Sequence, residues 1–289
     1  MNHFQKVFLF YPIKLLSLLP LQALYFIFYP CYFLLFYIFR YRRKITNQNL
    51  SNAFPNKSKK EISTIEKKYY KYLTKLFSEF VKGISISEKE LRKRVVLHDR
   101  DVLQNIYNNH GAAIVLLGHY GNWELIALAS ELIAPHHFNI IYKPLTSQFS
   151  NHLMQKIRTR FGADVTPMEF TYTAIKNLQN EKVLFTLVND QSPSNIKNVH
   201  WINFLNQQTA FMSGALTITK RLNIPVCFLE IKSYKSGFYE LYPKVIIEDN
   251  THHSTEGVIK IYAQLLEDNI RQKPELWLWS HRRWKHKAQ

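Results

Sequence analysis

The chain has 289 residues, enough for one large domain with a substantial core, and its 38 Lys and Arg against 21 Asp and Glu give a formal charge of +17. That excess predicts an anionic partner: nucleic acid, anionic lipid or an acidic carrier protein. Aromatic residues make up 15% of the chain, and many of them stand beside basic clusters, which favours a membrane interface over a nucleic-acid groove. Two cysteines, Cys31 and Cys227, give neither a disulfide framework nor zinc-ligand spacing, so we expect no metal and no cofactor.

The N-terminal part predicts a membrane segment. Leu15 to Phe39 carries no charge, and its 25 residues of helix would measure roughly 37 Å, enough to cross a bilayer core. Pro20 and Pro30 would kink this helix, so a re-entrant or embedded arrangement competes with a clean span. The basic flank Arg40–Lys44 places the remainder of the chain on the cytoplasmic side. We therefore expect an anchor over residues 1–44 and a second, catalytic domain over 45–289.

Two helical stretches come after the anchor. Residues 58–82 have apolar side chains at helical intervals on one face and lysines on the other. Those lysines are either solvated or lie against lipid headgroups, and the pattern favours neither. Residues 87–109 predict a second helix.

The segment Gly118–Glu124 is the strongest candidate site. It comes directly after the apolar run Ala112–Leu117, which predicts a buried strand, so His119 stands at a carboxyl end, where open α/β sheets carry their chemistry. Asn122 can cap a helix from Trp123 to Leu132, with Glu124 in its first turn. A carboxylate that holds one imidazole nitrogen leaves the other to take a proton from a hydroxyl. The alternative is a histidine that only hydrogen-bonds within a turn.

Strands and helices alternate in the rest of the chain. This pattern predicts an α/β fold, with a mainly parallel sheet covered by helices, behind the membrane-embedded N-terminal helix. The last two strands predict an antiparallel hairpin at an edge of the sheet. The expected strands are 138–142, 183–188, 226–232 and 238–247, and the expected helices are 147–161, 171–179, 209–222 and 255–272.

The sequence Gly-His-Tyr-Gly-Asn-Trp-Glu resembles the corresponding motif of the late acyltransferases of bacterial lipid A biosynthesis, in which His-x4-Glu precedes a helix. Residues 274–285 are similar to the Pro-Glu-x-x-x-Trp-x-His-Arg-Arg-Phe-Lys ending of that family. Further matches at 40–55, 142–162, 189–193 and 204–214 extend the resemblance over nearly the whole chain. Leu205 and Asn206 depart from the family's Phe-Phe-Gly, which puts in doubt any close backbone approach that the glycine allows.

The same matches predict substrate-binding or oxyanion residues. Lys143 stands where the family has arginine, so a bidentate guanidinium becomes a point charge. Arg158 and Arg160 end the next helix and could bind phosphate or stabilise an oxyanion, or could be a solvated helix end. Asp190 and Gln191 stand at the carboxyl end of another strand and match the family's Asp-Gln element. Asp190 could fix a loop or a basic residue of the site and Gln191 could hydrogen-bond the acceptor, although a turn before Pro193 also explains them.

The resemblance implies a membrane acyltransferase that moves a fatty acyl chain from acyl carrier protein to a hydroxyl of a lipid A precursor. It implies a location at the cytoplasmic face of the inner membrane, an anionic lipid acceptor and no nucleic-acid partner. His119 would be the base, and Glu124 would orient its imidazole. No Gly-x-Ser-x-Gly elbow is present, so direct transfer is expected. Two alternatives stay open: an acyltransferase for another lipid, glycerolipid or amino-acid lipid, and a non-catalytic basic binder of membrane surfaces.

Overall fold

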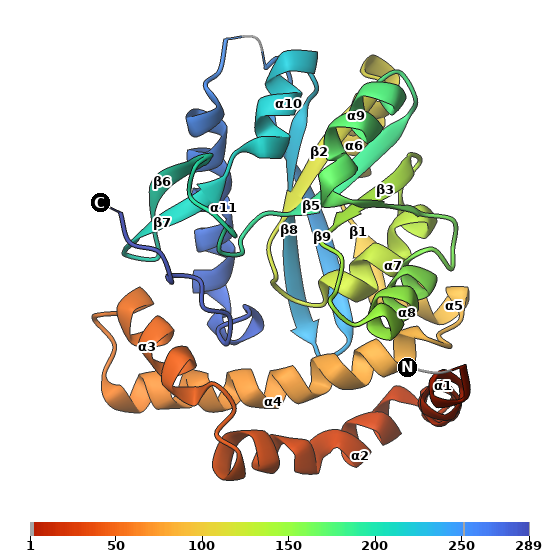
Figure 1. The fold of residues 1–289 in the computed structure, drawn as a ribbon, viewed down its shortest axis with the longest axis vertical. Helices are drawn as coiled ribbons and strands as arrows, with labels where there is room; N and C mark the ends of the chain where they lie inside the picture. Colours follow the sequence, from red (N-terminus) through yellow and green to blue (C-terminus); the bar gives the residue numbers. More distant parts are fainter. Residues whose placement is uncertain (1–2, 251, 289) are drawn as a thin grey trace.

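A seven-stranded sheet forms the centre of the protein, which we describe from a computed structural model over residues 3–250 and 252–288 (Figure 1). The strand order is β1-β9-β8-β2-β5-β3-β4. Every neighbouring pair is parallel except β8 and β9, which form an antiparallel hairpin. The strands are β1 (Val95–Leu97), β2 (Ala112–Leu117), β3 (His137–Tyr142), β4 (Asp164–Pro167), β5 (Val183–Val188), β8 (Val226–Lys235) and β9 (Phe238–Ile247).

Helices cover both faces of this sheet, which confirms the predicted α/β class. In Figure 1, α10 and α11 lie on one side of the sheet and α7 and α8 on the other. The central strand β2 is buried at all six positions, as its uninterrupted apolar sequence requires when both faces are covered. The helices after the first strand are α6 (Arg100–Asn109), α7 (Trp123–Ile133), α8 (Gln148–Arg158), α9 (Thr171–Leu178), α10 (Gly214–Leu222) and α11 (Thr255–Gln272), with 3-10 turns at Met168–Phe170 and Pro274–Leu276.

The N-terminal third forms a helical layer across the carboxyl edge of β2 (Figure 1). Its long helix α4 (Lys59–Gly83) begins with a capping box between Ser58 and Glu61. The other helices are α1 (His3–Ser17), α2 (Leu21–Phe33), a π-helical turn at Leu34–Ile38, α3 (Arg43–Ala53) and α5 (Glu88–Arg94). The helix expected over Leu15–Phe39 is interrupted before Pro20, one of the two prolines predicted to kink it; Pro20 stands at the N-cap of α2, and Pro30 lies inside α2.

Leu21–Ile38 is long and apolar enough to cross a membrane, and it is the one such segment among the described residues. Length and composition alone are weak evidence for a span, because core helices and signal sequences share them. About a fifth of this window, 22%, is buried inside the protein. One side of the segment therefore packs on the protein.

Three local predictions are wrong. The helix expected over 87–109 is divided by β1, whose residues Val95–Leu97 pair with β9. Because β1 covers β9, the β8–β9 hairpin is not at the edge. The helix expected from Thr209 begins at Gly214 instead, because β7 (Gln207–Met212) pairs with β6 (Val199–Phe204).

The residues of the β6–β7 turn explain why the sequence did not predict this hairpin. Leu205 and Asn206 both have left-handed backbones, with φ of 51° and 60°. Two successive positive φ values are typical of a two-residue type I′ hairpin turn, which glycine or asparagine normally supplies. Leu205 is fully buried and its N–H donates to Glu267 Oε2 at 2.6 Å, so packing holds an unfavourable residue in the turn.

Candidate active site

A sharp turn after β2 presents His119 at the carboxyl edge of the sheet. Gly118 has no room for a side chain, since a Cβ there would lie 2.5 Å from Leu266 Cδ1 and 3.2 Å from Asp190 Oδ2. Gly121 has φ of +61°, which reverses the chain. Asn122 then accepts the Leu125 N–H at 2.9 Å and caps α7, as predicted. The strand, turn and helix that position His119 are thus confirmed.

Asp190 holds the His119 imidazole. His119 Nδ1 lies 2.5 Å from Asp190 Oδ1, and the His119 backbone N–H donates to Oδ2 at 2.8 Å. Trp277 Nε1 donates to the same Oδ2 at 2.7 Å. Asp190 is 2% exposed, and burial acts to raise the pKa of its carboxyl; the neighbouring imidazole and these hydrogen bonds outweigh burial and lower that pKa. An ionised Asp190 fixes the tautomer with the proton on Nδ1, so Nε2 is the basic nitrogen.

Gln191 occupies the basic nitrogen of His119. Its Nε2 atom lies 3.0 Å from His119 Nε2 and donates to it in the tautomer set by Asp190. Parallel pairing of β2 with β5, with Leu117 opposite Val188, brings together the two loops at the carboxyl ends of these strands. A substrate hydroxyl that took the place of the Gln191 amide would meet the basic nitrogen directly.

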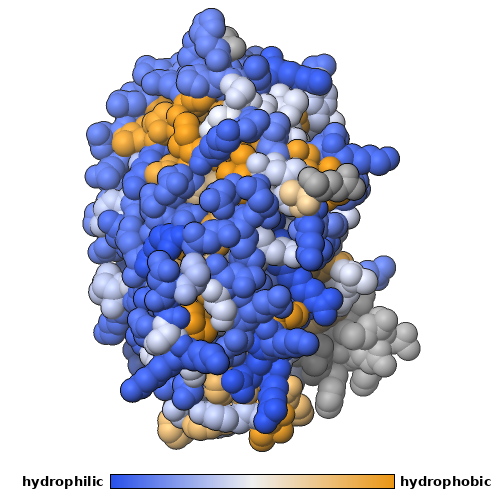
Figure 2. All heavy atoms as spheres, turned by 90° about the vertical axis from the view of Figure 1, so that its left-hand side faces the viewer, coloured by the Kyte–Doolittle hydropathy of each residue, from blue (hydrophilic) through white to orange (hydrophobic). Residues whose placement is uncertain are grey.

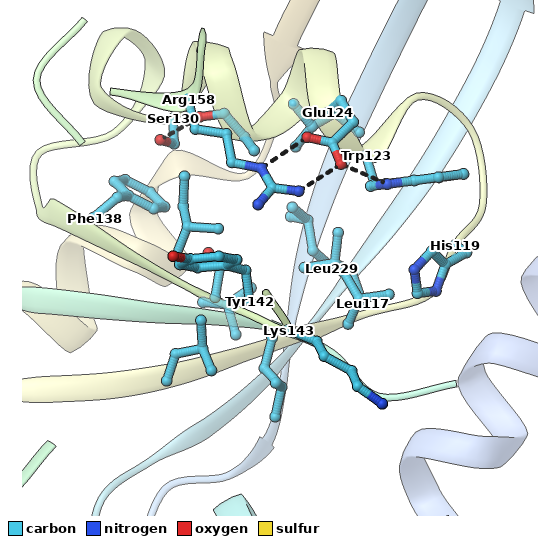
Figure 3. A pocket seen from close by; sticks show the side chains of 18 of the residues that line it. Leu117, His119, Trp123, Glu124, Ser130, Phe138, Tyr142, Lys143, Arg158 and Leu229 are labelled. Atoms are coloured by element: carbon cyan, nitrogen blue, oxygen red, sulfur yellow. Dashed lines mark hydrogen bonds and ion pairs between the residues drawn. The ribbon is translucent and has the colours of Figure 1, made fainter. Parts of the chain in front are cut away.

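Glu124 is not the carboxylate that holds His119, which corrects the predicted geometry. Both of its oxygens accept from Arg158, from Nε at 2.9 Å and from Nη2 at 2.7 Å. Trp123 Nε1 also donates to Glu124, at 3.1 Å, and the Trp123 ring lies edge-on to His119 with centroids 4.8 Å apart. Figure 3 shows Trp123 between His119 and the Glu124–Arg158 pair. The His-x4-Glu spacing therefore places Glu124 near the site, but its carboxylate is paired with Arg158 and not with His119.

A cavity of about 850 Å³ extends from His119 between α7 and the sheet (Figure 3). The polar residues that line it include His119, Glu124, Arg158 and Gln191. Its remaining lining is mainly aliphatic and aromatic, from both α7 and the strands, including Leu97, Leu117, Ile126, Phe138, Ile140 and Leu229. Such a volume is within the range of small-molecule sites, about 300–1,000 Å³. The volume and the mainly apolar lining suit a chain of methylene groups.

The two remaining predicted cations have different positions. Lys143 is exposed at the rim of this cavity, where its Nζ donates to Ser194 Oγ at 3.0 Å. Arg160 does not line the cavity. Its guanidinium donates to the backbone carbonyls of Gly83 and Ile86 at 2.6 and 2.9 Å, so it ties the end of α8 to the loop after α4. Burial lowers the pKa of Arg160.

The C-terminal motif forms the support under this site, a role that its sequence did not reveal. Its backbone pairs with the His119 turn: Gly121 N donates to Leu276 O and Leu278 N to His119 O, both at 3.1 Å. His281 Nε2 accepts the Ser192 N–H at 3.1 Å, and burial lowers the pKa of His281 to about 4, which keeps that nitrogen an acceptor at neutral pH. Together with the Trp277 indole on Asp190, these contacts orient both loops of the site.

The described residues contain no group of three or more His, Cys, Asp or Glu side chains arranged to hold a metal ion.

Comparison with curated proteins gives no match to this chain. The family profile described as bacterial lipid A biosynthesis acyltransferase matches residues 5–286. This range includes the His119 turn, the Asp190 loop and the C-terminal motif. The chain therefore belongs to the bacterial lipid A biosynthesis acyltransferase family.

Proposed function

We propose that this acyltransferase moves a fatty acyl chain from acyl carrier protein to a hydroxyl group of a lipid A precursor, at the cytoplasmic face of the inner membrane. The observation that supports this best is the position of His119, whose Nδ1 is held by buried Asp190 while the residue lines a large, mainly apolar cavity. The reaction needs a thioester carbonyl held in position and a hydroxyl that loses its proton. An apolar cavity can position the carbonyl by binding the hydrocarbon chain, and a base that lines it can take the proton.

The reaction proceeds directly between donor and acceptor. His119 Nε2 takes the proton of the acceptor hydroxyl as its oxygen forms a bond to the thioester carbonyl carbon. The tetrahedral intermediate then breaks its C–S bond, and the imidazolium returns the proton to the leaving thiolate. Asp190 stabilises the imidazolium that exists between these steps, because its carboxylate contacts Nδ1. The products are an ester and the free carrier thiol.

Arg158 is the best-placed cation for the developing oxyanion or an acceptor phosphate. It lines the cavity, its side chain is 14% exposed, and Glu124 holds two of its nitrogens in a bidentate pair. Within this proposal Glu124 acts through Arg158 and Trp123 and keeps the cation in one orientation. Lys143 adds positive charge at the cavity rim without planar recognition. The Gln191 amide stays hydrogen-bonded to the basic nitrogen, His119 Nε2, until the acceptor hydroxyl displaces it.

The test of the donor and the acceptor is reconstituted transfer. Purified enzyme in detergent receives an acyl chain on acyl carrier protein or on coenzyme A, with a lipid A precursor or a glycerolipid as acceptor. We expect the carrier-bound chain and the lipid A precursor to give the highest kcat/KM by mass spectrometry of the products. A preference for the glycerolipid would redirect the proposal to the alternative acceptor class.

Filling the cavity should shorten the accepted acyl chain. Ala127 lines it from α7, so Ala127→Leu and then Ala127→Phe should reduce kcat/KM for long chains more than for short ones, by at least about tenfold for the larger substitution, since each methylene of an acyl chain that loses its burial forfeits about 0.8 kcal/mol. The readout is competition between donors of different chain length. Ser130→Ala, which removes a cavity hydroxyl without filling space, is the matched control. Equal losses for all chain lengths would place the acyl chain elsewhere.

Salt should weaken transfer steeply. The +17 charge gathers an acidic carrier and an anionic acceptor, and that attraction is screened over about 8 Å at physiological ionic strength. Arg158→Gln should lower kcat more than Lys67→Gln, because Arg158 lines the cavity whereas Lys67 is an exposed residue of α4. Rates measured from low to high salt, with thermal unfolding in parallel, check both statements; equal losses at the two positions would leave Arg158 without a special role.

A further inference from the structure

The apolar segment α2 with its π-helical extension has two different faces. Leu21, Leu24, Tyr32 and Phe36 are buried against the protein. The opposite face is open, with Phe26 at 82% and Ile38 at 64% exposed. Other large apolar or aromatic residues exposed in the N-terminal segment are Tyr11, Leu15, Leu18, Ile27, Tyr29, Phe33, Leu34, Tyr37 and Phe39. Only one side of this segment is therefore available to lipid.

The buried side is fastened to α4 along its whole length. The two helices run antiparallel and side by side, as Figure 1 shows. Their contacts combine ring packing with hydrogen bonds to buried polar groups, which cost free energy when broken. In order along α4 they are Phe36 with Tyr70 (centroids 5.4 Å), Phe28 with Phe77 (5.0 Å) and Tyr25 Oη with Glu79 Oε1 (2.6 Å). The connection before α2 is held too: Lys82 Nζ donates to Leu19 O (3.1 Å), and Ser85 Oγ, just after α4, donates to Ser17 O at the end of α1 (2.6 Å).

Helix α4 cannot enter the hydrocarbon core. It carries an exposed set of lysines, Lys59, Lys60, Lys67, Lys68 and Lys71, and charged side chains at the bilayer centre are strongly disfavoured. An α2 helix standing upright across the bilayer would take α4 with it or would have to separate from α4. Separation would leave Glu79, which is 1% exposed, without its Tyr25 partner.

We propose that the protein is monotopic: the α1–α2 segment lies along the surface of one anionic leaflet, with its open apolar face inserted, and does not cross the bilayer. The inference rests on the membrane association within the proposed function and not on acyl transfer. Apolar side chains on one face, aromatic residues and a basic flank are typical of interfacial helices. Arg40, Arg43 and Lys44 come directly after the segment and line one shallow pocket. Glu66 also lines it and accepts from Arg43 at 3.2 Å, so Arg40 and Lys44 supply its net positive charge, which lipid phosphates can approach.

The surface has apolar residues at the height of this segment. In Figure 2 the visible face is largely hydrophilic, with orange residues in its upper part and a smaller orange group at its lower end, the height at which α2 lies in Figure 1. Glu79 connects the inserted segment to the turn that carries His119, because it also accepts from Asn122 Nδ2 at 2.8 Å and Tyr239 Oη at 2.7 Å. A leaflet against α2 would lie at the end of the protein toward which the carboxyl end of β2 points, with α4 between the leaflet and the sheet (Figure 1).

Sidedness tests the proposal without any activity measurement. In a background with Cys31→Ala and Cys227→Ala, the double variant Lys14→Cys/Lys60→Cys is reconstituted into sealed vesicles of phosphatidylethanolamine and phosphatidylglycerol. It is treated with a membrane-impermeant maleimide and weighed by intact mass spectrometry. Lys14 precedes the apolar segment and Lys60 comes after it in the chain, and both are exposed. We expect each molecule to carry two labels or none, whatever its orientation in the vesicle.

A spanning helix gives a different result. Its two cysteines would lie on opposite sides, so each molecule would carry one label until detergent is added, and that outcome would overturn the proposal. The control pair Lys44→Cys/Lys60→Cys lies after the segment in both topologies and should give two labels or none. A second measurement checks depth: a fluorophore on Phe26→Cys, near the middle of the segment, should be quenched more by lipids brominated near the headgroup than by lipids brominated at the chain ends. The reverse order would also contradict a surface position.

Discussion

Replacing His119 by alanine should lower the rate of acyl transfer by at least about 10²- to 10⁴-fold, the range that general-base catalysis contributes. The variant loses the nitrogen that accepts the hydroxyl proton, whereas the apolar cavity and the Arg158 pair stay in place. The loss should therefore appear mainly in kcat, with binding of the acyl donor largely kept. The measurement is transfer from a thioester donor to a lipid A precursor under single-turnover conditions.

Folding must be controlled, because His119 is a hydrogen-bond partner of a buried carboxylate. His119→Ala leaves Asp190 with Trp277 and a backbone N–H as donors. His119→Asn supplies a side-chain donor in place of Nδ1 and should fold better, yet it should be as inactive as the alanine variant. Thermal unfolding of both variants runs beside the assay. Near-normal rates in either well-folded variant would end the catalytic interpretation of His119.

The local parts of the site could be predicted from sequence. An uninterrupted apolar run with glycine at its end predicted β2, and Asn122 predicted the start of α7. Both signals act within a few residues, so no knowledge of tertiary structure is needed. The α/β class was inferred in the same way, from alternating patterns.

The sequence placed Asp190 near the site but assigned the imidazole to Glu124, because the true partner of His119 depends on strand order. Asp190 is 71 residues away along the chain, and it meets His119 only because β5 lies beside β2 with Leu117 opposite Val188. Glu124 was the nearer carboxylate in sequence, and it pairs with Arg158 instead. One signal was available: Asp190, like His119, stands just beyond the carboxyl end of a buried apolar strand, and such ends share one edge of a parallel sheet.

Other features had no local signal at all. Trp277 belongs to a segment without helical or strand periodicity, so nothing in its spacing indicates that its indole reaches Asp190. The β6–β7 hairpin has Leu205 and Asn206 at its turn rather than the glycine-containing pair that would mark one. Tertiary packing decides both features.

Asp190→Asn should cost more activity than Glu124→Gln. This comparison tests whether Asp190, as in the structure, or Glu124, as the His-x4-Glu spacing suggested, orients the His119 imidazole. Glu124→Gln removes the charge that pairs with Arg158 and should weaken the orientation of that cation, with a smaller loss of rate and a measurable loss of stability. In Asp190→Asn, an amide NH₂ group facing Nδ1 would donate rather than accept, which would move the imidazole proton to Nε2 and abolish the base. We expect a loss of about 10²- to 10⁴-fold for Asp190→Asn, again in kcat.

The double variant gives the sharper evidence, because residues that act as one unit are not additive. His119→Ala/Asp190→Asn should be little slower than His119→Ala alone, since without the imidazole Asp190 has nothing to orient. His119→Ala/Glu124→Gln should instead lose further activity, because Arg158 acts at a different atom of the substrate. A cycle of the single and double variants with the wild-type enzyme measures both couplings. Strong coupling of His119 to Glu124 and none to Asp190 would return the orienting role to Glu124, and it would show that the hydrogen bond to Asp190 does not serve the reaction.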